Sequence, residues 1–268
     1  RGKRLEFLKK NGLLYKKKQN IKRAEITILG ELPDNDIYDF ILLTIRENQL
    51  YEALFELKNN KSDTIVTMVN SLDSYKKWED IVGKGRILPA FPGAGGSIND
   101  ESILDASLTP RIIQPTTFAE IAGNKSERTK HFSKILKHAH IPYQEVKDMH
   151  MWQLCHLAMV VPIADAYYET DCPERAGRDW KIMKKTAERL KRNFIFLRKQ
   201  KGKLSLWKMN IFRFLPFLTI MLAIIFESSF GDKFMYQHAV KAPDEMRELH
   251  KQFYNYVKRR KTCGCKAL

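Results

Sequence analysis

Hydrophobic positions in the first half of the chain alternate between short β-branched runs and longer segments with helical spacing. The clearest pattern is residues 64–96, TIVTMVNSLDSYKKWEDIVGKGRILPAFPGAGG, which predicts a strand, a polar turn, a short helix, a second strand and a glycine loop. Upstream of it, residues 39–45 are almost wholly apolar, and residues 47–58 carry leucines three and four positions apart. Strand 39–45, helix 47–58 and strand 64–69 together predict a βαβ unit and hence a parallel sheet.

Shorter patterns predict further elements of this region: a strand at 24–29, extended chain at 111–121, a helix at 125–139 and an edge strand at 143–146. Beyond residue 147 only helical spacing is found. We therefore predict an α/β domain over 1–147 and an all-α domain over 148–268. The chain opens on a helical pattern with no strand before it, so we expect a segment upstream to be missing.

The helices predicted in the second domain span 148–169, 174–199 and 207–226, and a last one begins at Pro243. Asp148 is a suitable N-cap for the first of them. The apolar positions of this helix form one stripe of Trp152, His156, Met159, Ile163 and Ala166. Pro162 lies within it, and because proline cannot donate to the carbonyl four residues earlier, we expect a kink.

The most apolar run of the chain is residues 214–226, FLPFLTIMLAIIF. A membrane-spanning helix needs about 20 apolar residues, and this run is bounded by Arg213 and Glu227. We therefore predict no membrane contact, but a helix of the second domain that is buried on all sides between the amphipathic helices. Leu218, Leu222 and Ile225 are expected to be inaccessible to solvent.

Composition places the chain among globular proteins, with 44% hydrophobic and 29% charged residues over 268 positions. The four cysteines form neither a disulfide framework nor paired CxxC knuckles, which favours a cytoplasmic location and provides no metal site. The net charge of +16 is spread along the chain, and the basic residues are not interleaved with aromatics suited to base stacking. We therefore expect anionic small molecules rather than nucleic acid as ligands.

Asn70 is the first candidate for a functional residue. It directly follows strand 64–69, and ligands of open parallel sheets bind beyond the carboxyl ends of the strands. A neutral amide at that point can hydrogen-bond a ligand without adding charge. The same residue could instead cap the helix that we expect to start near Leu72, so both interpretations stay open.

The order of these segments resembles the ketopantoate reductase family, the 2-dehydropantoate 2-reductases and their relatives. The resemblance covers essentially the whole chain and rests on RGKR at 1–4, NGL at 11–13, DFILLTIR at 39–46 with Gln49, Asn70, FPGAGG at 91–96 and Trp152. It implies a Rossmann-like domain whose first βαβ element is missing, followed by a helical domain. It also implies NADP as cofactor and reduction of a 2-oxo acid or related carbonyl by hydride transfer. A homodimer is one assembly that such a protein could form.

Several residues match positions that bind the cofactor or the substrate in this family. Arg1 matches the basic residue that receives the 2′-phosphate of NADP, with Lys3 beside it, and a guanidinium fits a phosphate monoester. Arg46 matches a basic residue at a strand end that faces the cofactor, and Asn70 matches the asparagine after the next strand. Without the resemblance, Arg1 and Lys3 would be interpreted as a solvated terminus.

The chain departs from the family at the catalytic residues. Counted from Trp152, the positions of the family's lysine and of its two substrate-binding asparagines hold Leu154, Ala158 and Pro162. His156 lies nearby and could donate a proton to a developing alkoxide, so His156 and Asn70 are our catalytic candidates, with His238 as a weaker one. The alternative for His156 is a core histidine bonded to a neighbouring backbone carbonyl, for which one freed by the Pro162 kink is a candidate.

Three functions are compatible with these patterns. The first is an NADPH-dependent reductase of a 2-oxo acid or related carbonyl. The second is a non-catalytic relative that binds a dinucleotide or metabolite, because the lysine is lost. We expect the family's glycine-rich phosphate loop to lie in the missing upstream segment. Gly93–Gly96 does not replace that loop, since no clear helix follows it. The third, a nucleic-acid-binding protein, rests on charge alone.

Overall fold

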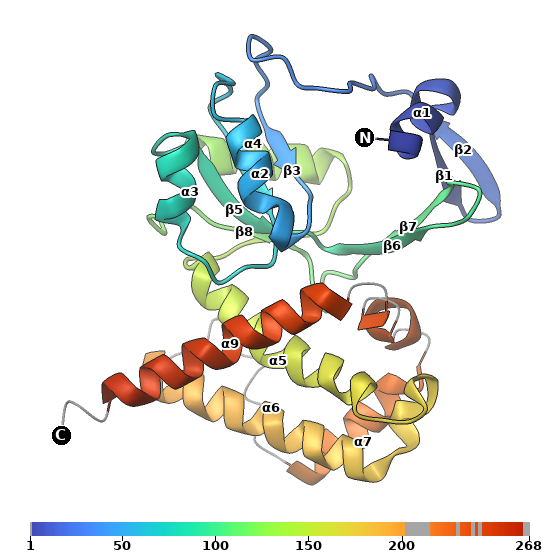
Figure 1. Cartoon of the computed structure of the whole chain (residues 1–268), viewed down its shortest axis with the longest axis vertical. Coiled ribbons are helices and arrows are strands. Elements are labelled where there is room, and N and C mark those ends of the chain that lie inside the picture. Colours follow the sequence, from blue (N-terminus) through green and yellow to red (C-terminus); the bar gives the residue numbers. More distant parts are fainter. Residues whose placement is uncertain (1, 202–214, 229–230, 237–238, 241–242, 265–268) are drawn as a thin grey trace. The chain divides into compact units, whose positions relative to one another are not determined.

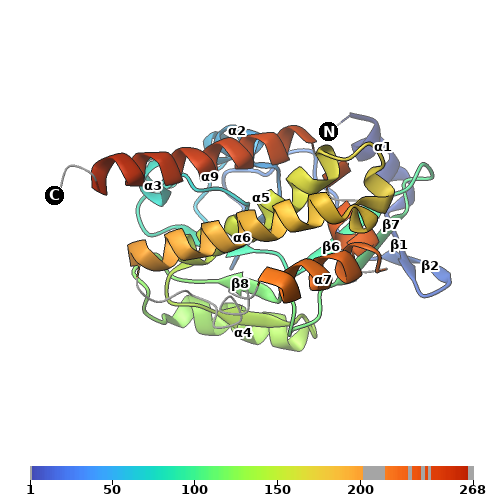
Figure 2. The ribbon, with the colours of Figure 1, turned by 90° about the horizontal axis from the view of Figure 1, so that it is seen from below.

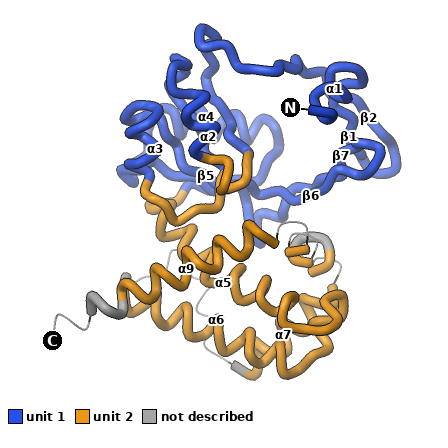
Figure 3. The backbone as a smooth tube through the Cα atoms, viewed as in Figure 1, with its two compact units in different colours: residues 1–44, 51–68, 75–145 blue, residues 45–50, 69–74, 146–268 orange. Residues whose placement is uncertain are grey.

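A computed structural model describes residues 2–201, 215–228, 231–236, 239–240 and 243–264. The chain divides into two compact units (Figure 3). Unit 1 contains residues 1–44, 51–68 and 75–145, and unit 2 contains residues 45–50, 69–74 and 146–268. Two short segments of the first half, 45–50 and 69–74, thus group with the helical second half.

The main sheet of unit 1 has the strand order β3-β4-β5-β8-β9. Figure 1 labels β3, β5 and β8 of this sheet. Its strands are β3 (Ile41–Leu43), β4 (Ile65–Met68), β5 (Ile87–Phe91), β8 (Thr116–Phe118) and β9 (Tyr143–Glu145). β3, β4 and β5 are parallel, β5 and β8 are antiparallel, and β8 and β9 are parallel. Because η1 (Glu47–Gln49) and α2 (Leu50–Glu56) lie between β3 and β4 in the chain, the predicted βαβ unit is confirmed.

The core of this sheet region follows from its apolar strands. Ile65 and Val66 of β4 are fully buried, as expected for a parallel strand that is covered on both faces. The helices α3 (Tyr75–Val82) and α4 (Glu127–His138) contribute buried aromatic side chains. In α4, Phe132 meets Phe118 of β8 edge to face, with ring centroids 5.0 Å apart. A capping box between Ser126 and Thr129 begins α4 one residue after the predicted start of its pattern.

A second sheet of unit 1 has the order β2-β1-β7-β6. The helix α1 (Gly2–Asn11) precedes its hairpin of β1 (Leu13–Lys17) and β2 (Asn20–Ala24), and β6 (Ala94–Ile98) and β7 (Leu104–Leu108) complete it. The predicted strand at 24–29 is wrong, because β2 ends where that strand was expected to begin. Leu13, the first residue of β1, pairs with Ala24, so no partner is left on β1 for residues beyond Ala24.

The expected glycine loop at the end of the 64–96 pattern is also wrong. Ala94–Ile98 is a strand, and Gly96 pairs with Ala106 of β7. A Cβ atom on Gly96 would lie 2.5 Å from the carbonyl oxygen of Asp105, and one on Gly93 would collide with the backbone of Thr116. These glycines therefore permit close approach of two backbones.

Unit 2 is built around α5 (Met149–Tyr168), which lies between α9 (Pro243–Gly264) and α6 (Trp180–Lys201) in both ribbon views (Figures 1 and 2). Its other described elements include η1 of segment 45–50, η2 (Pro173–Arg178), α7 (Leu215–Phe226) and η4 (Gly231–Tyr236). Asp148 is the N-cap of α5, as predicted, and accepts a hydrogen bond from the Met151 N–H. The predicted single stripe is wrong, because Leu154, Cys155 and Leu157 are buried as well.

The helix α7 has one buried face and one exposed face. Leu218 and Leu222 are buried as predicted, whereas Ile225 is only partly buried. Three apolar side chains of its other face are 53%, 51% and 66% exposed: Phe217, Ile220 and Ile224. The prediction of burial on all sides is wrong for α7 and fits α5 instead, since α5 has a helix on each side. Within the residues that the structure describes, no helix combines the length and the apolar character needed to span a membrane.

Pro162 lies within α5 and removes the helical donor for the carbonyl of Ala158. Asn193 of α6 replaces that donor, because its Nδ2 donates to the Ala158 oxygen at 3.1 Å. Both residues are buried, so water has little access to this carbonyl. The hydrogen bond explains why an asparagine lies among buried apolar residues of α6 such as Leu190 and Leu197.

We expect Asn193→Leu to lower the free energy of unfolding by about 1 to 3 kcal/mol, because it leaves a buried carbonyl unpaired. In a Pro162→Ala background, Asn193→Leu should lower the free energy of unfolding by less, since the alanine N–H can donate to the Ala158 carbonyl within the helix. Urea denaturation of the four proteins would measure this coupling. Equal costs in both backgrounds would show that Asn193 does not replace the bond that proline removes.

Candidate functional site

The segment 69–74 directly follows β4 and carries Asn70. The buried Gln153 of α5 holds its first residue, because Nε2 of Gln153 donates to the Val69 carbonyl at 3.0 Å. Asn70 is 9% exposed, and its Oδ1 atom is buried without a hydrogen-bond partner in the part of the chain that the structure describes. The helix α3 begins only at Tyr75, so the alternative that Asn70 caps a helix near Leu72 is wrong.

Arg46 lies in the other short segment of unit 2, residues 45–50. Its backbone is extended, with φ −75° and ψ 155°, and it directly precedes η1. The guanidinium side chain is exposed. A cation at this position is available to an anionic group of a ligand.

The two segments are connected to each other and to α9. Ser71 Oγ donates to Glu47 Oε1 at 3.4 Å. Gln252 of α9 donates from Nε2 to the same Glu47 oxygen at 2.9 Å and accepts at Oε1 from the Leu72 N–H at 3.2 Å. The structure thus brings together the two segments that carry Arg46 and Asn70.

His156 lies on α5, one turn beyond Trp152. The two rings stack with centroids 5.1 Å apart and planes 8° apart, and His156 is 6% exposed. The stack fixes the orientation of the imidazole. The carbonyl that Pro162 leaves free accepts its hydrogen bond from Asn193.

The positions at which the resembling family carries its lysine and asparagines are apolar and buried here. Leu154 and Ala158 are 0% exposed and belong to the core of unit 2, and Pro162 is buried too. None of these three side chains can donate or accept a proton. Any proton transfer in this unit would therefore need another group.

The remaining predicted residues are Arg1, His238 and Lys3. Arg1 and His238 lie outside the described residues. Lys3 is exposed in the first turn of α1 and belongs to unit 1, whereas Arg46, Asn70 and His156 belong to unit 2. In the described part of the chain, no group of three or more histidine, cysteine, aspartate or glutamate residues could hold a metal ion.

Sequence reasoning missed a charge cluster in unit 2. Asp165 Oδ1 lies 3.0 Å from His250 Nδ1, and Asp165 Oδ2 lies 3.6 Å from Arg189 Nη1. Arg189 also donates from Nη2 to Glu169 Oε1 at 2.7 Å. Burial raises the pKa of Asp165, although His250 and Arg189 act in the opposite direction. The only sequence signal is a pair of acids four residues apart, Asp165 within the mostly apolar α5 and Glu169 at its C-cap.

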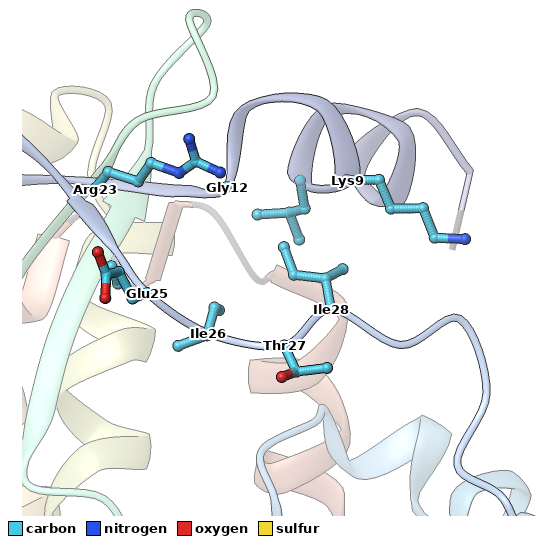
Figure 4. Close-up of a pocket in the computed structure, with 9 residues that line it drawn as sticks. Lys9, Gly12, Arg23, Glu25, Ile26, Thr27 and Ile28 are labelled. Carbon is cyan, nitrogen blue, oxygen red and sulfur yellow. The ribbon is translucent and has the colours of Figure 1, made fainter.

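An open hollow with a volume of about 790 Å³ lies in unit 1, between α1 and residues 23–28 (Figure 4). Lys9 and Arg23 supply positive charge, Glu25 supplies negative charge, and Ile26 and Ile28 are apolar. Of the predicted site residues that the structure describes, none lines this hollow. We therefore assign it no part in the candidate site.

No protein-family model and no curated protein matches the sequence. Solved structures do match the fold. D-mandelate dehydrogenase in complex with NADH matches with a TM-score of 0.65 and 12% identity, over 98% of this chain and 82% of that one. The 2-dehydropantoate 2-reductase from Geobacter metallireducens GS-15 matches with a TM-score of 0.62 and 11% identity, over 92% of this chain and 87% of that one. The 2-dehydropantoate 2-reductase from Porphyromonas gingivalis W83 matches with a TM-score of 0.57 and 13% identity, over 96% of this chain and 86% of that one.

At these identities the likeness shows the fold alone. The chain has a mixed α/β N-terminal region followed by a helical C-terminal region, arranged as in ketopantoate reductases and D-mandelate dehydrogenase. The predicted fold class is confirmed to this extent.

Proposed function

We propose that this protein binds a nicotinamide dinucleotide at segments 45–50 and 69–74 and uses it to reduce a 2-oxo acid or a related carbonyl. The observation that carries the proposal is the side chain of Asn70. Its neighbours Val69 and Ser71 are hydrogen-bonded within unit 2, whereas its buried Oδ1 has no partner among the described residues. An unpaired buried oxygen costs about 1 to 3 kcal/mol, which a hydrogen-bond donor on a ligand would recover.

Each candidate residue has a role that its chemistry permits. The nicotinamide, when bound, supplies a hydride. Asn70 accepts a hydrogen bond from the ligand, for which a carboxamide N–H is a suitable donor. Arg46 attracts the phosphates of the cofactor or the carboxylate of the substrate. His156 donates a proton to the carbonyl oxygen as it becomes an alkoxide, with its ring held by the stack on Trp152.

Fluorescence titration of the protein with NADPH, followed by a screen of 2-oxo acids for NADPH oxidation, tests this function. We expect Asn70→Ala to weaken NADPH binding about tenfold, which corresponds to one hydrogen bond of about 1.4 kcal/mol. Asn59→Ala, at an exposed asparagine of unit 1, is the matched control and should leave the affinity unchanged. Equal NADPH affinities of wild-type protein and Asn70→Ala would contradict the proposed role of Asn70.

Cofactor preference is a separate prediction, which rests on the family resemblance of Arg1 and Lys3. We expect tighter binding of NADPH than of NADH, because a guanidinium and an ammonium favour the 2′-phosphate. Arg1→Ala should reduce the affinity for NADPH and leave that for NADH unchanged. Titration of the wild-type protein and of Arg1→Ala with both nucleotides measures this, and a preference for NADPH that survives in Arg1→Ala would contradict the role of Arg1.

A second candidate function is binding of the dinucleotide or of a metabolite without catalysis. The burial of Leu154, Ala158 and Pro162 in apolar surroundings favours it, because these positions provide no catalytic group. NADPH binding without turnover of any carbonyl in the screen would support this second function. Turnover that is lost in His156→Gln, with NADPH affinity retained, would support the first.

A further inference from the structure

Gln252, on α9, contacts both segments of the proposed site with one side-chain amide. Its Nε2 donates to Glu47 Oε1 at 2.9 Å, and its Oε1 accepts from the Leu72 N–H at 3.2 Å. A carboxamide is suited to this position because it offers a donor on one atom and an acceptor on the other. Lysine and glutamate can each serve only one of the two partners.

The contacts of Gln252 belong to a small network around Asn70. Ser71 Oγ donates to the Glu47 oxygen that Gln252 also binds. On the other side of Asn70, Gln153 of α5 holds the Val69 carbonyl. Asn70 is therefore placed between two hydrogen-bonded neighbours, whereas its own Oδ1 has no partner within the described residues.

We propose that Gln252 is a positioning residue, which holds Arg46 through Glu47 and Asn70 through Leu72 in the arrangement that receives the nicotinamide dinucleotide. The ligand in this inference rests on the proposed function, whereas the two contacts of Gln252 do not. Holding both segments in place before binding increases affinity, because they need not be ordered when the ligand arrives. Gln252 itself touches neither the ligand nor the reacting atoms in this role.

Two variants separate the contacts of Gln252. Gln252→Leu removes both, so hydrogen–deuterium exchange should become about tenfold faster in residues 45–50 and in residues 69–74. Gln252→Glu keeps an acceptor for the Leu72 N–H but sets a carboxylate against Glu47, so only residues 45–50 should exchange faster. Adding Glu47→Gln to Gln252→Glu restores a donor opposite an acceptor, and exchange in 45–50 should return to the wild-type rate. Asn255→Ala, at an exposed amide on α9, is the control.

NADPH titration distinguishes positioning from a purely structural role. Gln252→Leu should weaken NADPH binding about tenfold, and it should add a smaller loss in an Asn70→Ala background, because only its effect through Glu47 and Arg46 remains there. Unchanged exchange in Gln252→Leu overturns the inference whatever the protein binds. Faster exchange with unchanged NADPH affinity also overturns it. A wild-type protein that binds neither NADPH nor NADH overturns the proposed function instead, whichever way the exchange experiment turns out.

Discussion

A Leu154→Lys variant is expected to lose most of its stability rather than to gain reductase activity. Leu154 stands where the family resemblance places the catalytic lysine, but its side chain is 0% exposed within the apolar core of unit 2. Burying an ammonium group costs several kcal/mol, and the lost leucine packing adds about 2 to 5 kcal/mol. The sum is comparable with the free energy of unfolding of a typical domain, about 5 to 15 kcal/mol. Soluble yield and thermal denaturation would measure the loss.

Leu154→Met is the matched control for this prediction and should cost less than about 1.5 kcal/mol, because it conserves volume and polarity. A pH series adds a second test. Burial lowers the lysine pKa in the folded state below its unfolded value near 10.4, so the destabilisation should be largest at neutral pH and decrease as the pH rises toward about 10. A folded Leu154→Lys protein that reduces 2-oxo acids would show that position 154 faces a substrate, contrary to this prediction.

Elements whose formation depends on neighbours in the sequence were predicted well. The apolar runs of β3 and β4 and the leucines between them identify a βαβ unit, and Asp148 marks the start of α5. The wrong strand at 24–29 shows the limit of this reasoning. Apolar character favoured it, but the turn of the β1–β2 hairpin sets the register and ends pairing at Ala24. A strand is defined by its partner, which periodicity in one segment does not reveal.

Burial was predicted less well than helix formation, for a similar reason. The composition of α7 suggested a central helix, yet α5 holds that place because two long helices flank it. At the candidate site, the position of Asn70 after β4 follows from the sequence, but its unpaired oxygen does not. The partners of Gln252 are separated from it by 180 and 205 residues, so only the folded chain shows these contacts.

Arg189→Leu is expected to lower the free energy of unfolding by about 3 to 5 kcal/mol. The guanidinium lies 2.7 Å from Glu169 Oε1 and 3.6 Å from Asp165 Oδ2. The side chains of Arg189 and Asp165 are only 17% and 15% exposed, so removing the cation leaves negative charge with little access to water. Removing one partner of a buried ion pair typically costs this much. Urea denaturation at pH 7 would measure it, with Arg198→Leu on the exposed face of α6 expected to change stability by less than about 0.5 kcal/mol.

The pH dependence of the stability lost in Arg189→Leu shows whether the loss of charge is its cause. Burial already raises the pKa of Asp165, and loss of Arg189, which opposes that shift, raises the pKa further. A carboxyl group whose folded pKa is raised contributes stability below its unfolded pKa, near 4, and loses it as the pH rises through the folded value. The stability that Arg189→Leu loses should therefore become smaller as the pH falls from 7 to about 4. At pH 7, adding Asp165→Asn should recover part of this lost stability. A deficit that neither pH nor Asp165→Asn relieves would mean that Arg189 stabilises unit 2 through the packing of its aliphatic stem.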